Sequence, residues 1–335
     1  MPANVLGPPA AWVVGSGGLL GGAVCRYLRA RGHVVLTSSI PWQDPAAAVA
    51  ELLHEAARLP SSPWEVYWCA GSGVVGSGPK QLDQEVEVLQ SFLQQWRPVP
   101  GANGFFLASS AGGVYAGSHG PPFTEYTMPV PISRYGRAKL RSEEVATAFA
   151  ERSGVSLLVG RISNLYGPGQ DIGKQQGLIS QLCRAELSRQ PLSIYVSLDT
   201  MRDYLFVDDA AAMVVTATGQ VTGSGRRALK VLGSERSTTV GAILGELRRV
   251  TRRRPPVVLG TSASARLQVR DLRLRSVAWP STRGLARTQL GAGVAATLAS
   301  IGDQARASRA GPVTAPGASG PTSPAGLAEP GARGR

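Results

Sequence analysis

The stretch Ala11-Trp12-Val13-Val14-Gly15-Ser16-Gly17-Gly18-Leu19-Leu20-Gly21-Gly22 decides the fold. Its first four residues form the short apolar run that a buried parallel strand requires, and residues 23–30 continue as a helix. Glycines between a strand and a helix permit a tight turn, and the amides and dipole of the helix N-terminus then stabilise a pyrophosphate. Residues 33–37 predict the next strand, and in this setting the glycine turn predicts a dinucleotide site.

Strands and helices alternate along the first half of the chain, which predicts an α/β fold with a Rossmann-type doubly wound parallel sheet. Residues 40–44 are too short for a further strand with its loop, and the second strand ends in Thr37-Ser38-Ser39 without an acidic residue or an arginine. Those residues usually separate NAD from NADP sites, so the predicted cofactor is NAD or NADP, with NAD ahead. The residues predicted to bind it are Gly15, Gly17, Gly18, Leu19, Leu20, Gly21, Ser38, Ala70, Gly71, Tyr135 and Lys139.

Tyr135 and Lys139 lie four residues apart in a stretch whose Ala, Leu and Glu content predicts a helix, so their side chains share one face. A tyrosine with a pKa of about 10 is a poor base, but a neighbouring ammonium favours the phenolate and makes an acid/base catalyst. The alternative is a surface helix with a lysine directed to solvent. Only four of the 35 basic residues are lysines, which favours a site that needs a compact cation.

Two serines follow the apolar run of residues 104–108, which predicts another buried strand. Hydroxyls at the carboxyl edge of a parallel strand lie where open α/β sheets bind ligands. Ser109 or Ser110 would then hydrogen-bond the same substrate oxygen that Tyr135 protonates. The two serines are also compatible with the start of a loop.

Composition excludes several classes of protein. Hydrophobic residues make up 43% and charged residues 17%, as in a globular chain, and no apolar run approaches the roughly 20 residues of a membrane span. The three cysteines and three histidines are scattered, so no metal site is predicted. The net charge of +13 includes an arginine-rich region at residues 248–275, which lacks the interleaved aromatic residues of nucleic-acid binders. We expect a cytoplasmic protein without a nucleic-acid or membrane partner.

The chain is expected to divide into four parts. A leader at residues 1–10 precedes the dinucleotide-binding domain of residues 11–163. Residues 164–302 form a smaller substrate-binding lobe over the carboxyl edge of the sheet, with some elements returning to the sheet. Asp208 or Asp209 is expected to cap one helix there, and Thr238 another. Residues 303–335 hold almost no large apolar side chain, which predicts a disordered tail without a catalytic role.

Four motifs, spread over residues 11–302, resemble those of the extended short-chain dehydrogenase/reductases, in the group of NAD-dependent nucleotide-sugar epimerases and dehydratases. Gly15, Gly18 and Gly21 match the glycine fingerprint of that family. Tyr135 and Lys139 match its Tyr-x-x-x-Lys pair. Two further stretches look like signatures of its sugar-nucleotide lobe: Arg161-Ile-Ser-Asn164-Leu-Tyr-Gly-Pro and Arg202-Asp-Tyr-Leu-Phe-Val-Asp-Asp209.

This resemblance implies an enzyme in which Tyr135 exchanges a proton with a sugar hydroxyl while the nicotinamide exchanges hydride at the same carbon. Lys139 would hold the nicotinamide ribose and lower the pKa of the phenol. Ser109 or Ser110 would orient the sugar oxygen.

The resemblance also implies the partners of the protein. Asn164 and Arg202 would contact the diphosphate of a nucleotide-diphosphate sugar. Relatives often dimerise through the helices that correspond to residues 81–96 and 135–152, which implies a homodimer.

Two departures from the family narrow the reaction. The catalytic Ser or Thr of the family falls at Ala111, so Ser110 would be a shifted substitute. Sugar 4,6-dehydratases carry an Asp-Glu pair just after this hydroxyl, where the chain has Gly112 and Gly113, so dehydration is not expected. The leading hypothesis is a 4-epimerase working through a transient 4-keto sugar. The alternatives are a nucleotide-4-keto-sugar reductase and a catalytically silent NAD(P)-binding sensor.

Overall fold

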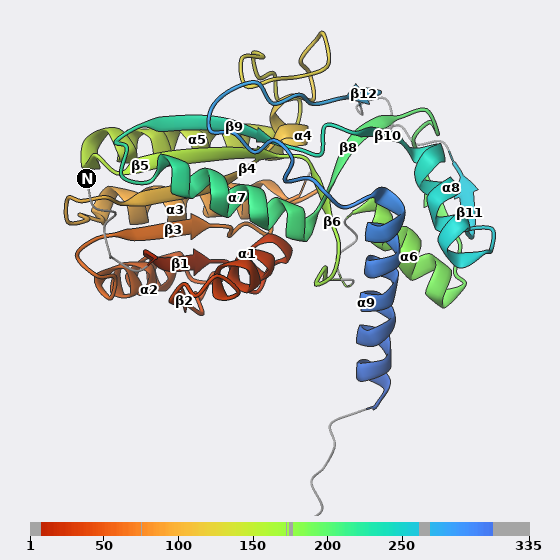
Figure 1. Cartoon of the computed structure of the whole chain (residues 1–335), viewed down its shortest axis with the longest axis horizontal. Helices are drawn as coiled ribbons and strands as arrows, with labels where there is room; N and C mark the ends of the chain where they lie inside the picture. Colours follow the sequence, from red (N-terminus) through yellow and green to blue (C-terminus); the bar gives the residue numbers. More distant parts are fainter. Residues whose placement is uncertain (1–7, 75, 172, 174–176, 261–268, 311–335) are drawn as a thin grey trace, which may run out of the picture.

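The computed structural model describes residues 8–74, 76–171, 173, 177–260 and 269–310. Figure 1 shows a sheet with flanking helices at one end of the molecule and a smaller lobe at the other. The first part comprises β1 (Ala10–Val14), α1 (Leu19–Arg29), β2 (Val35–Thr37), α2 (Pro45–Ala57), β3 (Trp64–Trp68), α3 (Pro79–Gln95), β4 (Gly104–Ser110), α4 (Ala111–Val114), α5 (Arg134–Ser153), β5 (Ser156–Ile162), α7 (Val207–Val221) and β9 (Arg227–Leu232). Its six strands run parallel in the order β2-β1-β3-β4-β5-β9.

Helices cover both faces of this sheet. Trp12 and Val14 of β1 pack in a buried cluster with α2, α3 and α5, whereas Ala11 and Val13 pack with α1 and α7 on the other face. All four side chains are fully buried, because a parallel strand covered on two faces needs apolar residues at successive positions. The predicted Rossmann-type doubly wound sheet is confirmed. Strand β2 lies at its edge, and residues 40–44 form no further strand beyond it.

The smaller lobe is built around β8, which pairs with β6, β10 and β12. Its helices α6, α8 and α9 share a separate buried cluster that includes Leu182, Ile243 and Val294. Helix α7 and strand β9 belong to the main sheet although they follow elements of the lobe in sequence. The elements of the lobe are β6 (Asn164–Tyr166), α6 (Leu178–Ser188), β7 (Leu192–Ile194), β8 (Met201–Phe206), β10 (Ser237–Thr239), α8 (Val240–Thr251), β11 (Val257–Leu259), β12 (Asp271–Leu272) and α9 (Leu290–Ala310).

Two predicted helix caps in the lobe are corrected. Helix α7 begins directly after β8 at Val207, so Asp208 and Asp209 lie in its first turn. Their negative charges interact favourably with the helix dipole there, but their side chains do not cap the helix. Thr239, not Thr238, caps α8 and accepts a hydrogen bond from the N–H of Ala242 at 3.1 Å. The cap is shifted because residues up to Thr239 still pair with β8.

Helix α9 continues beyond the boundary expected at residue 302 and ends at Ala310. Residues 303–310 are rich in Ala and Arg, which are good helix formers, and Asp303 pairs with Arg306 one turn later. Helix propensity and this ion pair therefore extend the helix where large apolar side chains are lacking. Residues 311–335 of the expected tail lie outside the described residues. Among the residues that the structure does describe, no helix is long and apolar enough to cross a membrane.

Replacing Gly15 by alanine should destabilise the fold. Gly15 has φ +86°, and an added Cβ would lie 2.7 Å from backbone atoms of Ala70, just after β3. The left-handed conformation and the close backbone contact together cost about 2–4 kcal/mol. Chemical denaturation without cofactor measures the change. Gly17→Ala is the matched control, because no atom lies within 4 Å of its added Cβ; equal stability of the two variants would contradict this interpretation.

Candidate active site

The glycine turn after β1 is packed closely against its surroundings. A Cβ added to Gly21 would lie 2.2 Å from the carbonyl oxygen of Gly15, so the start of helix α1 packs directly against the glycine turn. Gly18 precedes α1 and provides no side-chain cap, while Gly17 and Gly18 are exposed. The N-terminus of α1 therefore has no side-chain cap, which leaves its first N–H groups without a side-chain acceptor, as an anion site requires. Leu19 is half-buried and Leu20 is buried in the core beneath them.

The hydroxyl of Ser38 is directed into the protein. It accepts a hydrogen bond from Nε1 of Trp12 at 2.8 Å and donates one to the carboxylate of Glu55 at 3.2 Å. This places the Ser38 side chain between β1 and α2, away from the glycine turn. A cofactor contact at this position therefore falls to the backbone of residues 37–39.

Tyr135 and Lys139 lie in the first two turns of α5, which Ser133 caps by accepting a hydrogen bond from the N–H of Gly136 at 3.0 Å. The Lys139 ammonium lies 5.6 Å from the centre of the Tyr135 ring, and both side chains are half-buried. A Cβ added to Gly71 would lie 3.2 Å from Nζ of Lys139. The pair thus stands beside the segment that follows β3, at the carboxyl edge of the sheet.

Helix α5 approaches α4 so closely that only glycines fit between them. A Cβ on Gly136 would lie 2.1 Å from the carbonyl oxygen of Gly113, and a Cβ on Gly113 would lie 3.0 Å from Cε1 of Tyr135. The Tyr135 ring therefore rests on the backbone of Gly113. An acidic residue at position 113, as in the dehydratases, would have to displace the tyrosine.

Glu85 of α3 holds the segment after β3 in place. Its Oε1 accepts hydrogen bonds from the N–H groups of Ser72 at 2.8 Å and Gly73 at 2.7 Å. Its Oε2 would lie 3.5 Å from a Cβ on Gly71, the glycine that faces Lys139. Glu85 could not be predicted from the sequence, because a single carboxylate on an amphipathic helix carries no local signal of a distant partner.

The two serines at the end of β4 have different surroundings. Ser109 is buried and donates a 2.5 Å hydrogen bond to Glu143. Ser110 is half-buried, and its oxygen accepts a 3.1 Å hydrogen bond from the N–H of Gly113, which caps the short helix α4. The proton of the Ser110 hydroxyl remains available to a substrate oxygen. Ala111, at the position of the family's Ser or Thr, is completely buried in an apolar cluster with Tyr115.

A buried ion pair lies one helical turn beyond Lys139. Glu143 of α5 receives two hydrogen bonds from Arg161 of β5, from Nε at 3.1 Å and from Nη2 at 2.7 Å. Arg161 also donates to the hydroxyl of Tyr115 at 2.8 Å. Burial opposes the charge of Arg161, but the hydrogen bonds and charge of Glu143 outweigh it and raise the pKa of the guanidinium.

Glu143 and Tyr115 were not among the residues predicted from the sequence. The available signal was periodicity, because Tyr135, Lys139 and Glu143 follow at intervals of four residues and share one helix face. Arg161 appeared only within a signature of the lobe. Its role in the structure is to neutralise Glu143 beneath the Tyr135–Lys139 pair.

Asn164 and Arg202 lie on the paired strands β6 and β8, respectively. The Asn164 amide donates a 2.9 Å hydrogen bond to the carbonyl oxygen of Asp203 and leaves its own oxygen exposed to a ligand. Arg202 donates to the carbonyl oxygen of Met201, and burial holds the pKa of its guanidinium below the ordinary value. The structure thus brings these two residues together at the base of the lobe.

In the described part of the chain, no three His, Cys, Asp or Glu side chains gather as a metal site would require.

Removing the cation of the buried pair should destabilise the protein strongly. Arg161→Leu leaves the Glu143 charge buried without a partner, at an expected loss of about 3 kcal/mol in the free energy of unfolding. Arg141→Leu is the matched control, since Arg141 of α5 forms a half-exposed ion pair with Asp83 of α3 and its loss should cost about 0.5 kcal/mol or less. Denaturant unfolding measures both, and similar losses for the two variants would contradict the assignment.

Comparison with known proteins gives the family. The model of the NAD dependent epimerase/dehydratase family matches residues 11–229. The dTDP-4-dehydro-6-deoxyglucose reductase of Escherichia coli is 33% identical over 109 residues, which are 32% of this chain and 34% of that protein. The chain spans less than half of the length of the curated relatives that it matches.

Solved structures share the fold along most of the chain. The UDP-glucose 4-epimerase of Thermotoga maritima with UDP-glucose superposes with a TM-score of 0.73 at 20% identity, covering 88% of this chain and 99% of that one. MoeE5 in complex with UDP-glucose and NAD gives a TM-score of 0.70 at 24% identity and the same coverage. Because the family model covers more than half of the chain and its motifs lie at the site described above, the protein belongs to the NAD dependent epimerase/dehydratase family.

Proposed function

We propose that the protein is an NAD(P)-dependent nucleotide-sugar oxidoreductase, and specifically a 4-epimerase that works through a transient 4-keto sugar. One observation carries the proposal: Tyr135 and Lys139 stand together at the carboxyl edge of the sheet, between the Gly113 backbone and Gly71. Ligands of open α/β sheets bind at this edge. The family match and the epimerase among the structural neighbours support the same reaction class.

The glycine turn and α1 would hold the dinucleotide through the uncapped N–H groups of the helix. The chemistry that a bound nicotinamide would supply there is reversible hydride transfer at the sugar carbon. Tyr135 takes the proton of the sugar hydroxyl and later gives it back, and the Lys139 ammonium stabilises the phenolate between these steps. Ser110 orients the sugar oxygen through its free hydroxyl proton. Asn164 and Arg202 bind the nucleotide diphosphate by charge and hydrogen bonding.

A 4-keto-sugar reductase is the second candidate, supported by the E. coli reductase among the relatives. Both reactions use Tyr135 and Lys139 in the same way. They differ in stoichiometry, because an epimerase regenerates its cofactor in each cycle whereas a reductase consumes one NAD(P)H per product.

The buried Ala111 favours a third candidate, a cofactor sensor without turnover, since it removes the family's hydroxyl from the site. Dimerisation through α3 and α5 stays a prediction.

Tyr135→Phe should abolish turnover and leave cofactor binding intact. The change removes only the hydroxyl that moves the proton, so we expect kcat to fall by about 10²–10⁴-fold. The assay offers UDP-, dTDP- and GDP-sugars and identifies products by mass spectrometry and chromatography, while NADH fluorescence reports binding. Tyr126→Phe is the matched control, because Tyr126 is 81% exposed in the loop before α5. Full activity of Tyr135→Phe would refute the mechanism.

Nucleotide-sugar turnover should proceed without net consumption of reduced nicotinamide. The absorbance of NAD(P)H at substrate excess distinguishes the two reactions, since an epimerase leaves it constant while the product accumulates. Consumption of one NAD(P)H per product would identify the reductase. Tight cofactor binding without any product would identify the sensor.

A further inference from the structure

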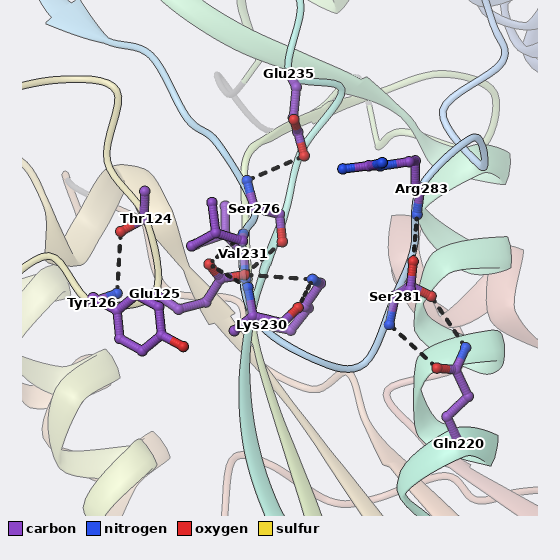
Figure 2. Close-up of polar contacts among 12 residues, drawn as sticks. Thr124, Glu125, Tyr126, Gln220, Lys230, Val231, Glu235, Ser276, Ser281 and Arg283 are labelled. Atoms are coloured by element: carbon purple, nitrogen blue, oxygen red, sulfur yellow. Dashed lines mark hydrogen bonds and ion pairs between the residues drawn. The ribbon is translucent and has the colours of Figure 1, made fainter.

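Glu125 carries a buried carboxylate with an unusual number of donors. It lies in the loop between α4 and α5, and its side chain is 2% exposed. Figure 2 shows it surrounded by β9 and by the chain segment that follows β12. The donors are the N–H groups of Val231 at 3.0 Å, Val277 at 2.9 Å and Ala278 at 3.4 Å and the hydroxyl of Ser276 at 2.5 Å. The ammonium of Lys230 adds an ion pair at 3.6 Å.

These contacts keep Glu125 ionised. Burial alone would raise the pKa of the carboxyl, but the hydrogen bonds from Ser276, Val277 and Val231 outweigh burial and lower the pKa below its ordinary value. Lys230 is only 3% exposed, and burial lowers the pKa of its ammonium, while Glu125 opposes that shift. Lys230 also donates a hydrogen bond to the carbonyl oxygen of Ala278. Carboxylate and ammonium thus hold the same segment from two sides.

The carboxylate joins the substrate lobe to the loop that leads into α5. Residues 273–278 follow β12, whose Leu272 pairs with Arg202 in β8. The same segment pairs with the loop through Phe123, whose N–H donates to the carbonyl oxygen of Arg273 at 2.8 Å and whose carbonyl oxygen accepts from Arg275 at 2.9 Å. Glu125 therefore lies where the segment that follows β12, the neighbour of the strand that carries Arg202, meets the loop.

The loop is in turn tied to the helix of the catalytic pair. The hydroxyl of Tyr115 donates to the carbonyl oxygen of Thr124 at 2.8 Å, next to Glu125. The same hydroxyl accepts from Arg161, which binds Glu143 of α5. Contacts consequently run without interruption from residues 276–278 through the loop to the face of α5 that carries Tyr135 and Lys139.

We propose that Glu125 is a positioning residue for the reaction of this site, an inference that rests on the proposed function. Its carboxylate holds residues 276–278 and the end of β9 against the loop, and so fixes the distance between Arg202, on the substrate side, and Tyr135. A purely structural ion pair would affect stability alone. A positioning residue affects the chemical step in molecules that are fully folded, because small misplacements of reacting groups cost up to about 10²-fold in rate.

The test compares Glu125→Gln with Glu125→Gln/Lys230→Met. Glutamine keeps the size of the side chain and one acceptor oxygen, but it removes the charge. The double variant also removes the unpaired ammonium, so its stability should recover toward that of the wild type. Glu151→Gln is the matched control, because Glu151 forms a half-exposed ion pair with Arg227 of the same strand β9.

For both Glu125 variants we expect kcat at least about tenfold below wild type, with the Kd for NAD(P)H within about twofold. Amide hydrogen exchange should quicken in residues 115–133 and 273–278 and stay unchanged in α1. Glu151→Gln should match the wild type. Wild-type kcat in Glu125→Gln, or recovery of kcat together with stability in the double variant, would overturn the proposal.

The exchange measurement keeps this inference separate from the proposed function. If the wild type turns over no nucleotide sugar, the proposed function fails while the exchange data still report on the contact. Unchanged exchange in residues 115–133 of Glu125→Gln would then overturn the positioning role without reference to activity.

Discussion

The geometry of the site depends on the buried ion pair between Glu143 and Arg161. Two charges removed from water are tolerated only when they meet each other and when their remaining donors and acceptors are also paired. Here the Ser109 hydroxyl donates a further hydrogen bond to the Glu143 carboxylate, and the Tyr115 hydroxyl accepts one from the Arg161 guanidinium. A shift of α5 along the sheet would separate all of these groups at once. The pair therefore fixes the helix, and with it the two side chains that lie one and two turns earlier.

The second buried pair is formed by Glu125 and Lys230. The contacts of Glu125 join a loop to segments that lie more than a hundred residues later in the sequence. Arg161 and Val231 are register partners on β5 and β9, so the two ion pairs arise from neighbouring positions of adjacent strands. Tyr115 and Thr124 bridge them. The carboxyl edge of the sheet is thus organised by charges below the site as well as by the residues that face it.

Local features of the chain were predictable from sequence, and long-range ones were not. The glycine turn and the Tyr135–Lys139 spacing depend on residues close in sequence, so their fold and their shared helix face could be derived directly. Glu125 and Glu143 depend on partners that lie far away in sequence. The four-residue spacing from Lys139 is the local sign for Glu143, whereas the neighbourhood of Glu125 does not distinguish it from a surface carboxylate. The caps of α7 and α8 were misplaced for the same reason. Helix α7 begins where β8 ends, and α8 begins where the pairing of β10 with β8 ends.

The scarcity of lysine has a broader meaning than catalysis. Lys139 and Lys230 both occupy confined positions, beside Gly71 and beside Glu125, respectively. A guanidinium at either position would bring five donors in a planar group, and buried donors without partners are costly. An ammonium at Lys230 satisfies one carboxylate and one carbonyl oxygen in the space available. Lys80, by contrast, is exposed. At these two positions the lysine therefore marks a confined cation, and the tyrosine four residues earlier is what makes Lys139 a candidate for catalysis.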